Sequence, residues 1–230
     1  MKKFDDLKPD FKDRAHTAAQ LMFSEIPVVG GLVTEIFNEI ITPSLERRRN
    51  EWLNNLMEKV VQLEKKIEGF TIESLSENDK FLTCTLEATQ IALRTHQKMK
   101  LECLRNAVIN TAIIGAIDDD KINMYLHLVE VFGENHLKLL LFLRNPKQFF
   151  QNNGITSPCF LSGSPLTLIE IAYPDLKGEK EYLNKIVMDL YQNGLISIQS
   201  LSTTMTESGM YASRTTKFGD EFLLFISSNI

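Results

Sequence analysis

The last seventy residues of the chain follow an order of patterns that few folds can accommodate. Residues 179–193 have the apolar spacing of one helix face, and Gly194 follows as a stop signal. Residues 195–200 and 210–216 have the composition of two short strands, and residues 218–226 return to helical spacing. The apolar residues that share the first helix face are Leu183, Ile186, Val187 and Leu190. We therefore expect a helix, a hairpin and a closing helix.

This order is typical of a winged helix, a module that docks on DNA or on another protein. The expected fold class is mainly α, with a multi-helix bundle over residues 1–150 and a small winged-helix-like α+β module over residues 164–230. A linker over residues 151–163 would join them. It is placed there because turn-forming residues interrupt the helical pattern: Asn152, Asn153, Gly154, Pro158 and Gly163.

Helical patterns fill the part of the chain before this linker. We expect one helix to end at Ile41 and the next to open with Thr42 as its N-cap and Pro43 at its first position. Residues 134–143 leave almost no polar face, which predicts a place at the centre of the core. The expected helices before the linker are 11–23, 26–41, 43–68, one that begins at residue 76 and has a core face up to Ala92, 98–114, 121–132 and 134–143.

Composition points to a water-soluble protein of the cytoplasm. Hydrophobic residues make up 43% and charged residues 24% of the 230 positions, which are ordinary values for a globular chain. The three cysteines, Cys84, Cys103 and Cys159, are an odd number without a C-x-x-C pair, so we expect buried free thiols in a reducing compartment. No apolar run follows the basic N-terminus, so no signal peptide is expected.

No catalytic, cofactor-binding or metal site is expected, and the chain is predicted not to be an enzyme. Asp118, Asp119 and Asp120 lack the alternating ligands of a metal loop, and one of them is expected to cap the next helix. His127 and Glu130 have a spacing used in di-metal bundles, but no second pair matches them. The usual catalytic and phosphate-binding motifs do not occur.

A constitutive membrane span is not expected. Residues 26–41 are the most apolar stretch, but they contain Glu35 and Glu39 and are shorter than the roughly 20 apolar residues of a bilayer span. A membrane-active effector, in which the 26–41 helix is released on a trigger, remains one alternative hypothesis.

The charge of the C-terminal module separates a DNA reader from a protein-docking module. Residues 160–230 contain five basic and eight acidic residues, a net charge of −3, whereas DNA affinity rests on phosphate neutralisation. This balance favours a protein partner or self-association. The expected contacts with a protein are Tyr191, Met210 and Tyr211. A DNA-binding transcriptional regulator remains an alternative, with Lys180, Asn184, Lys185, Gln192 and Arg214 as its contacts.

Three segments carry a resemblance to a known group: "IPVVGGLVTEIF", "LERRRNEWLNNL" and the tail "LYQNGLI…TKFGDEFLLFI". They resemble uncharacterised bacterial proteins of the Abi-alpha family, which are grouped with abortive-infection factors. The resemblance implies a helical N-terminal region, a winged-helix-like C-terminal segment and a cytoplasmic role in phage defence without a known catalytic residue. The leading hypothesis is therefore a non-enzymatic protein–protein interaction protein in bacterial phage defence.

Overall fold

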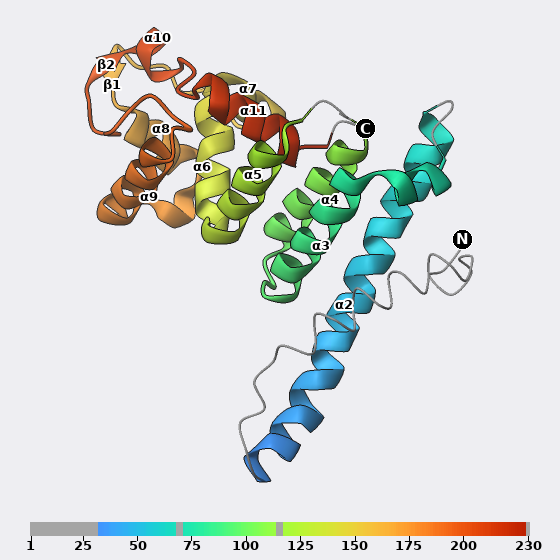
Figure 1. Ribbon diagram of the computed structural model, residues 1–230. Coiled ribbons are helices and arrows are strands. Elements are labelled where there is room, and N and C mark those ends of the chain that lie inside the picture. Colours follow the sequence, from blue (N-terminus) through green and yellow to red (C-terminus); the bar gives the residue numbers. More distant parts are fainter. Residues whose placement is uncertain (1–31, 68–70, 114–116, 229–230) are drawn as a thin grey trace. The chain divides into compact units, whose positions relative to one another are not determined.

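The computed structural model describes residues 32–67, 71–113 and 117–228, with side chains from residue 43 onward (Figure 1). The described chain is mainly helical, as predicted, with one small two-stranded sheet. It divides into two compact units. Unit 1 takes the residues up to Glu130 and those from Ile226 onward, and unit 2 takes Val131–Phe225. The predicted helix at residues 11–23 lies outside the described residues.

The elements of unit 1 are almost all helices. They are α2 (Leu32–Lys66), η2 (Glu73–Glu77), α3 (Asp79–Leu93), α4 (Lys98–Ile113) and α5 (Asp119–Val131), the last of which ends at the boundary. Unit 2 mixes helices with two short strands. Its elements are α6 (Glu134–Arg144), α7 (Pro146–Asn152), β1 (Ser162–Gly163), α8 (Pro165–Ala172), η3 (Pro174–Leu176), α9 (Lys180–Gln192), β2 (Met205–Thr206), α10 (Glu207–Met210) and α11 (Lys217–Ile226).

The predicted break at Thr42-Pro43 is wrong, because α2 continues through it with Pro43 in its interior. A proline removes one backbone N–H from a helix, and no glycine or second proline accompanies it in α2. Of the predicted 26–41 helix, residues 32–41 form the start of α2 and residues 26–31 lie outside the described residues. No helix in the described ranges combines the length and apolar character that a membrane crossing requires.

Unit 1 is built on α3 and α4, which lie side by side with α2 along them (Figure 1). Among the α2 side chains that the structure describes, Trp52 is the first buried one, and its indole Nε1 donates a hydrogen bond of 2.9 Å to Thr89 Oγ1 on α3. The N-terminal half of α2 extends past α3 and α4 (Figure 1). At the start of α5, the Asp118 carboxylate accepts a 3.0 Å hydrogen bond from the Asp120 N–H, which confirms the predicted cap.

Two buried asparagines of α4 bring the last described residues into unit 1. Asn106 Nδ2 donates to the carbonyl of Ile226 at 3.0 Å, and Asn110 Nδ2 donates to the carbonyl of Ser227 at 2.9 Å. The last carbonyl groups of a helix lack partners within the helix, so these amides supply hydrogen-bond donors to carbonyls at the end of α11. The chain thus leaves unit 1 after Glu130 and returns to it at Ile226.

Helix α6 lies at the centre of unit 2, as predicted from its apolar sequence. Leu137, Leu139 and Leu140 are completely buried, and the ring of Phe142 meets the rings of Phe149, Phe150 and Tyr173. The predicted linker at 151–163 lies within unit 2 and begins with the end of α7. Its polar, glycine and proline residues form an anchored loop and one strand of the sheet, so their composition marked irregular backbone and not a boundary between units.

The predicted strands at 195–200 and 210–216 are reduced to one antiparallel bridge, Ile196 to Thr215. The two-stranded ladder lies elsewhere and pairs Ser162 with Thr206 and Gly163 with Met205. Met210 is the last residue of α10, because the Thr206 hydroxyl accepts a hydrogen bond from the Gly209 N–H and starts a helical turn there. The Thr206 cap therefore starts a helix within the segment where the sequence pattern had predicted a hairpin.

Candidate functional site

Helix α9 of unit 2 has one buried and one exposed face. The four predicted core residues of this helix are completely buried, and Gly194 follows its end with a φ of +71°. On the solvent side, Tyr182 is 44% exposed and Met188 is 36% exposed. Lys185 lies between them at a spacing of three residues to each, so all three border the same stretch of helix surface.

The positive charge of Lys185 is balanced within α9. Its Nζ lies 2.6 Å from Asp189 Oδ1 one turn further along the helix. The hydrogen bond from Lys185 lowers the pKa of the Asp189 carboxyl below its ordinary value, and a hydrogen bond from His136 adds to this effect, while partial burial opposes it. This part of the surface therefore carries a paired ammonium and carboxylate with no net charge.

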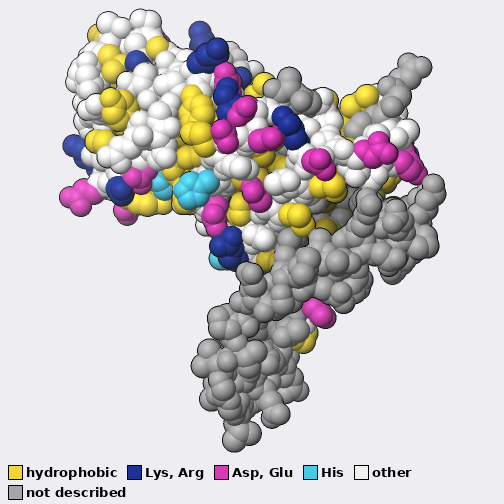
Figure 2. Space-filling view, viewed as in Figure 1, with side chains coloured by type: hydrophobic (Ala, Val, Ile, Leu, Met, Phe, Trp, Pro, Cys, Tyr) yellow, Lys and Arg dark blue, Asp and Glu magenta, His cyan; other side chains and the backbone are white. Residues whose placement is uncertain are grey.

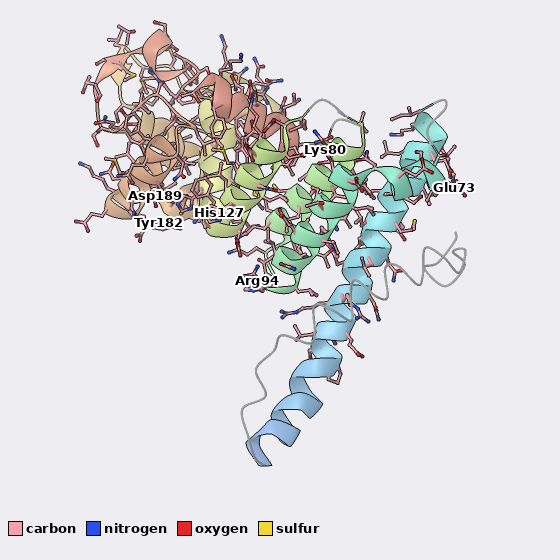
Figure 3. All side chains as sticks on the ribbon, viewed as in Figure 1. Glu73, Lys80, Arg94, His127, Tyr182 and Asp189 are labelled. Atoms are coloured by element: carbon pink, nitrogen blue, oxygen red, sulfur yellow. The ribbon has the colours of Figure 1, made fainter. Side chains whose placement is uncertain are left out.

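Helix α6 borders this face through polar contacts. His136 Nε2 lies 3.4 Å from Asp189 Oδ2, and the His136 ring stacks on Phe132 with 4.9 Å between ring centres. Asn135 Nδ2 donates a hydrogen bond of 3.2 Å to the Tyr182 hydroxyl. Tyr182 and Asp189 lie on the same side of α9 (Figure 3). The hydrogen bond from Asn135 restrains Tyr182 at the surface and so lowers the entropy that this side chain would lose on docking.

The five residues expected to contact DNA do not form one basic surface. Lys180 and Gln192 are exposed and Asn184 is half-buried on α9, while Lys185 is paired with Asp189. Arg214 is turned into unit 2, where its Nη2 donates to the Gly209 carbonyl and lies 3.0 Å from the Met205 sulfur. On the face drawn in Figure 2, the described Lys and Arg side chains are dispersed among Asp and Glu.

The three residues expected to contact a protein partner occupy different environments. Tyr191 is half-buried on α9. Met210 is only 2% exposed, so the expectation that it is an exposed contact is wrong. Its side chain packs against Gly163 and fills the space that a Cβ atom at that position would need. Tyr211 is half-buried, and its hydroxyl donates a 2.6 Å hydrogen bond to the Pro158 carbonyl. Tyr211 therefore anchors the loop that contains Pro158.

The exposed apolar residues of unit 2 that sequence reasoning missed include Tyr182, Met188 and Leu161. A helical wheel of α9 would have found the first two, because they fall beside the polar face and outside the row of Leu183 and Ile186. Leu161 gave no signal, since a leucine next to a predicted linker is equally consistent with a buried position. Its exposure depends on the course of the loop.

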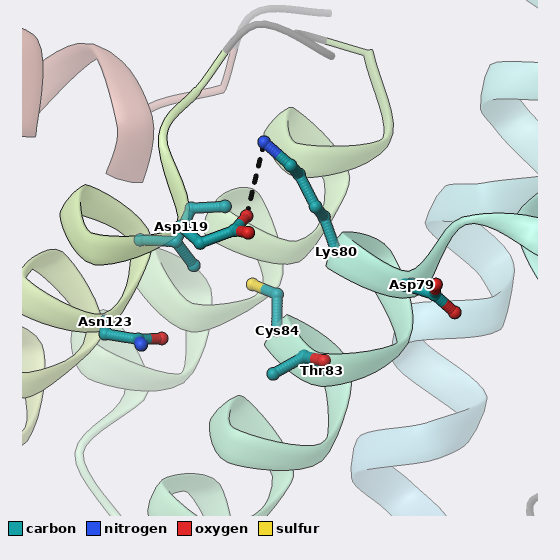
Figure 4. Close-up of a pocket in the computed structure, with 7 residues that line it drawn as sticks. Asp79, Lys80, Thr83, Cys84, Asp119 and Asn123 are labelled. Atoms are coloured by element: carbon teal, nitrogen blue, oxygen red, sulfur yellow. Dashed lines mark ion pairs between the residues drawn. The ribbon is translucent and has the colours of Figure 1, made fainter.

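Unit 1 contains a hollow of about 160 Å³ between the starts of α3 and α5 (Figure 4). Lys80 Nζ lies 3.2 Å from Asp119 Oδ1 and donates to the Ile117 carbonyl at 2.8 Å. The Cys84 thiol below them is buried and accepts a hydrogen bond from Thr111; burial raises its pKa to about 12. A thiol of this pKa is protonated at neutral pH and is a poor nucleophile, so the hollow shows no activated group.

Other clusters of ionisable residues in unit 1 are explained by packing. The Glu130 carboxylate forms an ion pair with Arg94 at 2.9 Å and lies 3.8 Å from His127. The backbone carbonyl of Glu130 accepts a hydrogen bond from Lys100. Arg94 and Lys100 contact the last turn of α5, where the helix dipole favours positive charge. Among the described residues, no group of three or more His, Cys, Asp or Glu side chains is arranged to hold a metal ion.

Comparisons with known proteins returned no match: no protein-family model, no curated protein and no solved structure was found to be similar to this chain. The resemblance to the Abi-alpha family therefore stays a prediction from three short segments. What the chain does must be inferred from the surfaces described above, and α9 offers the exposed aromatic and apolar side chains with the most defined surroundings.

Proposed function

We propose that this chain is a non-enzymatic protein–protein interaction protein, and that the exposed face of α9 is its docking surface. One observation carries the proposal: Tyr182 and Met188 stay exposed on either side of Lys185, whose charge is cancelled by Asp189 at 2.6 Å. Interface cores are depleted in net charge and enriched in Tyr and Met. The face therefore suits an apolar protein surface better than a polyanion.

The DNA-binding alternative is disfavoured by the same contacts. A DNA reader needs free cations that release counterions from the phosphates. In unit 2 Lys185 is paired with Asp189, Arg214 is bonded to the Gly209 carbonyl, and Lys217 lies 3.9 Å from Glu221. Each of these cations would have to leave a present partner before it could contact a phosphate.

The proposed absence of catalysis is supported by the state of the polar groups in unit 1. In the hollow between α3 and α5, Lys80 is held by Asp119 and by a carbonyl, and Cys84 is held as a neutral thiol. A general base or nucleophile needs a pKa near the working pH, and the thiol is far from it.

We also propose that unit 2 contains a variant of the winged-helix arrangement. The order β1, α8, α9 and β2 places a strand before two helices and returns to that strand, as the ladder between β1 and β2 shows. The bridge joins Ile196, near the start of the first predicted hairpin strand, to Thr215, near the end of the second, as the base of a hairpin would. In this arrangement α9 takes the place of the helix that docks.

The proposed setting is bacterial phage defence, which rests on the Abi-alpha resemblance alone. Cells that express the chain should resist infection in a plaque assay. A Tyr182→Ala/Met188→Ala double variant should lose this resistance at an unchanged protein level, because both proposed anchors are removed. Equal resistance in cells with the wild-type chain and in cells with the double variant would show that the α9 face has no part in defence.

The docking proposal is tested by site-specific photo-crosslinking in cells. A photoreactive phenylalanine analogue at position 182 or 188 should give one discrete adduct with another protein. The same analogue at the exposed Lys177 of unit 2 is the matched control and should give none. In parallel, purified chain is mixed with duplex DNA at about 50 mM salt, where electrostatic binding is strong. Binding of DNA there, together with no protein adduct at 182 or 188, would overturn the proposal.

A further inference from the structure

Residues 148–169 of unit 2 contain no Asp, Glu, Lys, Arg or His, although 24% of the whole chain is charged. This stretch includes the loop between α7 and β1, which we define as the neutral loop, residues 153–161. Surface loops normally carry polar and charged residues, so an uncharged loop of this length is unusual in a chain of this composition.

The neutral loop is anchored on the core of unit 2. The Ile155 N–H donates to the Phe150 carbonyl at 3.0 Å, and the Tyr211 hydroxyl donates to the Pro158 carbonyl at 2.6 Å. The Tyr211 ring also packs edge-on against Phe150, with 6.2 Å between ring centres. A loop held in this way needs little further ordering when it binds, so its surface is available at low entropic cost.

Beyond its anchors, the neutral loop presents apolar side chains to solvent. Leu161 is fully exposed, Cys159 is exposed, and Phe160 is half-exposed. Strand β1 follows directly, and within the described part of the chain it pairs with β2 alone. A strand edge that has no partner presents backbone groups of the kind that pair with a strand of another chain.

We propose that the neutral loop is a self-association surface, on which the same loop of a second copy of this chain docks across a two-fold axis. In a two-fold contact each patch meets itself, so a charged patch brings like charges together and a neutral one does not. The lack of charge over residues 148–169 fits this requirement. It also gives an anionic membrane no Lys or Arg to bind.

The first two charged residues that follow β2 in the sequence are Glu207 and Arg214. Glu207 begins α10 next to β2 and is exposed. The Arg214 guanidinium is bonded to the Gly209 carbonyl inside unit 2. The neutral loop is separate from the α9 face, so it can fail or succeed independently of the docking function proposed above.

Charge introduced at position 161 provides the first test. Purified wild-type chain should be dimeric in sedimentation velocity at tens of micromolar. Leu161→Asp and Leu161→Lys should each be monomeric, because each places like charges near the axis. An equal mixture of the two variants should restore the dimer. The matched control is Leu224→Asp, which changes another exposed leucine of unit 2 and should leave the dimer intact. A monomeric wild type, or a dimer that Leu161→Asp leaves unchanged, would overturn the proposal.

The native cysteines provide the second test without further engineering. Cys84 and Cys103 are buried, and burial raises the pKa of each thiol to about 12, so Cys159 is the thiol open to modification. A short bis-maleimide should therefore join two wild-type chains through Cys159. Cys159→Ser should abolish the product, and Leu161→Asp should reduce it at least tenfold. Crosslinking that persists in Leu161→Asp would refute the proposed contact, and so would a wild-type chain that gives no product.

Discussion

The two buried cysteines are residues whose acid–base chemistry the fold changes strongly. Cys84 and Cys103 lie on α3 and α4, and loss of hydration raises the pKa of each thiol from 9.0 to about 12. The folded thiols therefore keep their protons above pH 9, whereas the same thiols in the unfolded chain lose them. Stability that is fully present below pH 9 is lost as the pH rises toward 12.

We predict that the free energy of unfolding falls between pH 9 and pH 10, with a contribution of roughly 1 kcal/mol from each buried thiol. Urea unfolding at a series of pH values measures this slope. Cys84→Ala should make the slope shallower, although the lost packing lowers stability at every pH. Cys159→Ala is the control and should leave the slope unchanged, because that side chain is exposed. An identical slope in Cys84→Ala would contradict the assignment.

At the scale of elements, sequence reasoning succeeded where one face of a helix is buried along its whole length. Helices α9 and α11 were predicted to within one residue at each end, because their apolar spacing is regular and Gly194 marks a stop. The hairpin between them was not predicted correctly, since two-residue strands have no periodicity to detect. Thr206 and Glu207 started a short helix there instead.

The candidate site was predictable only as an element. The sequence predicted the helix at α9, but it could not tell Tyr182, which is exposed, from Tyr191, which is half-buried on the same helix. Nor could it show that Arg214 turns inward to the Gly209 carbonyl. These outcomes depend on contacts between residues distant in sequence, such as the hydrogen bond from Asn135 to Tyr182.

Pro43 lies inside α2 and is expected to lower the stability of this helix. In the interior of a helix, proline costs about 3 kcal/mol through its missing N–H and its clash with the preceding turn. Pro43→Ala should therefore raise the free energy of unfolding by up to about 3 kcal/mol, measured by urea titration of the helical circular dichroism signal. Asn50→Ala, an exposed change in the same helix, should give less than about 1 kcal/mol. Equal gains in the two variants would mean that a new helix begins at Pro43.

At the scale of the whole molecule, the return of the chain to unit 1 is the main structural fact. Asn106 and Asn110 are buried on α4 and donate to the carbonyls of Ile226 and Ser227. A buried amide that loses its acceptor costs about 1–3 kcal/mol, so these bonds matter more than exposed ones.

We predict that Asn106→Ala/Asn110→Ala loosens the last residues of the chain. Hydrogen exchange measured by mass spectrometry should show faster exchange in peptides that cover residues 222–228, with a smaller change over α2. The control is Asn123→Ala on α5, where the asparagine is exposed. Unchanged protection of residues 222–228 in the double variant would show that other contacts hold this segment.

Because unit 2 lies in the sequence between two pieces of unit 1, it is an insertion, and neither unit is a simple truncation product. A fragment that stops at Glu130 would lack unit 2, and it would also lack the carbonyl groups that accept hydrogen bonds from the buried Asn106 and Asn110 side chains. A faithful version of unit 1 would instead need residues 226–228 rejoined to α5 by a short linker. Deletion mapping of this chain should accordingly be done by excision and religation, since shortening it from the end damages both halves at once.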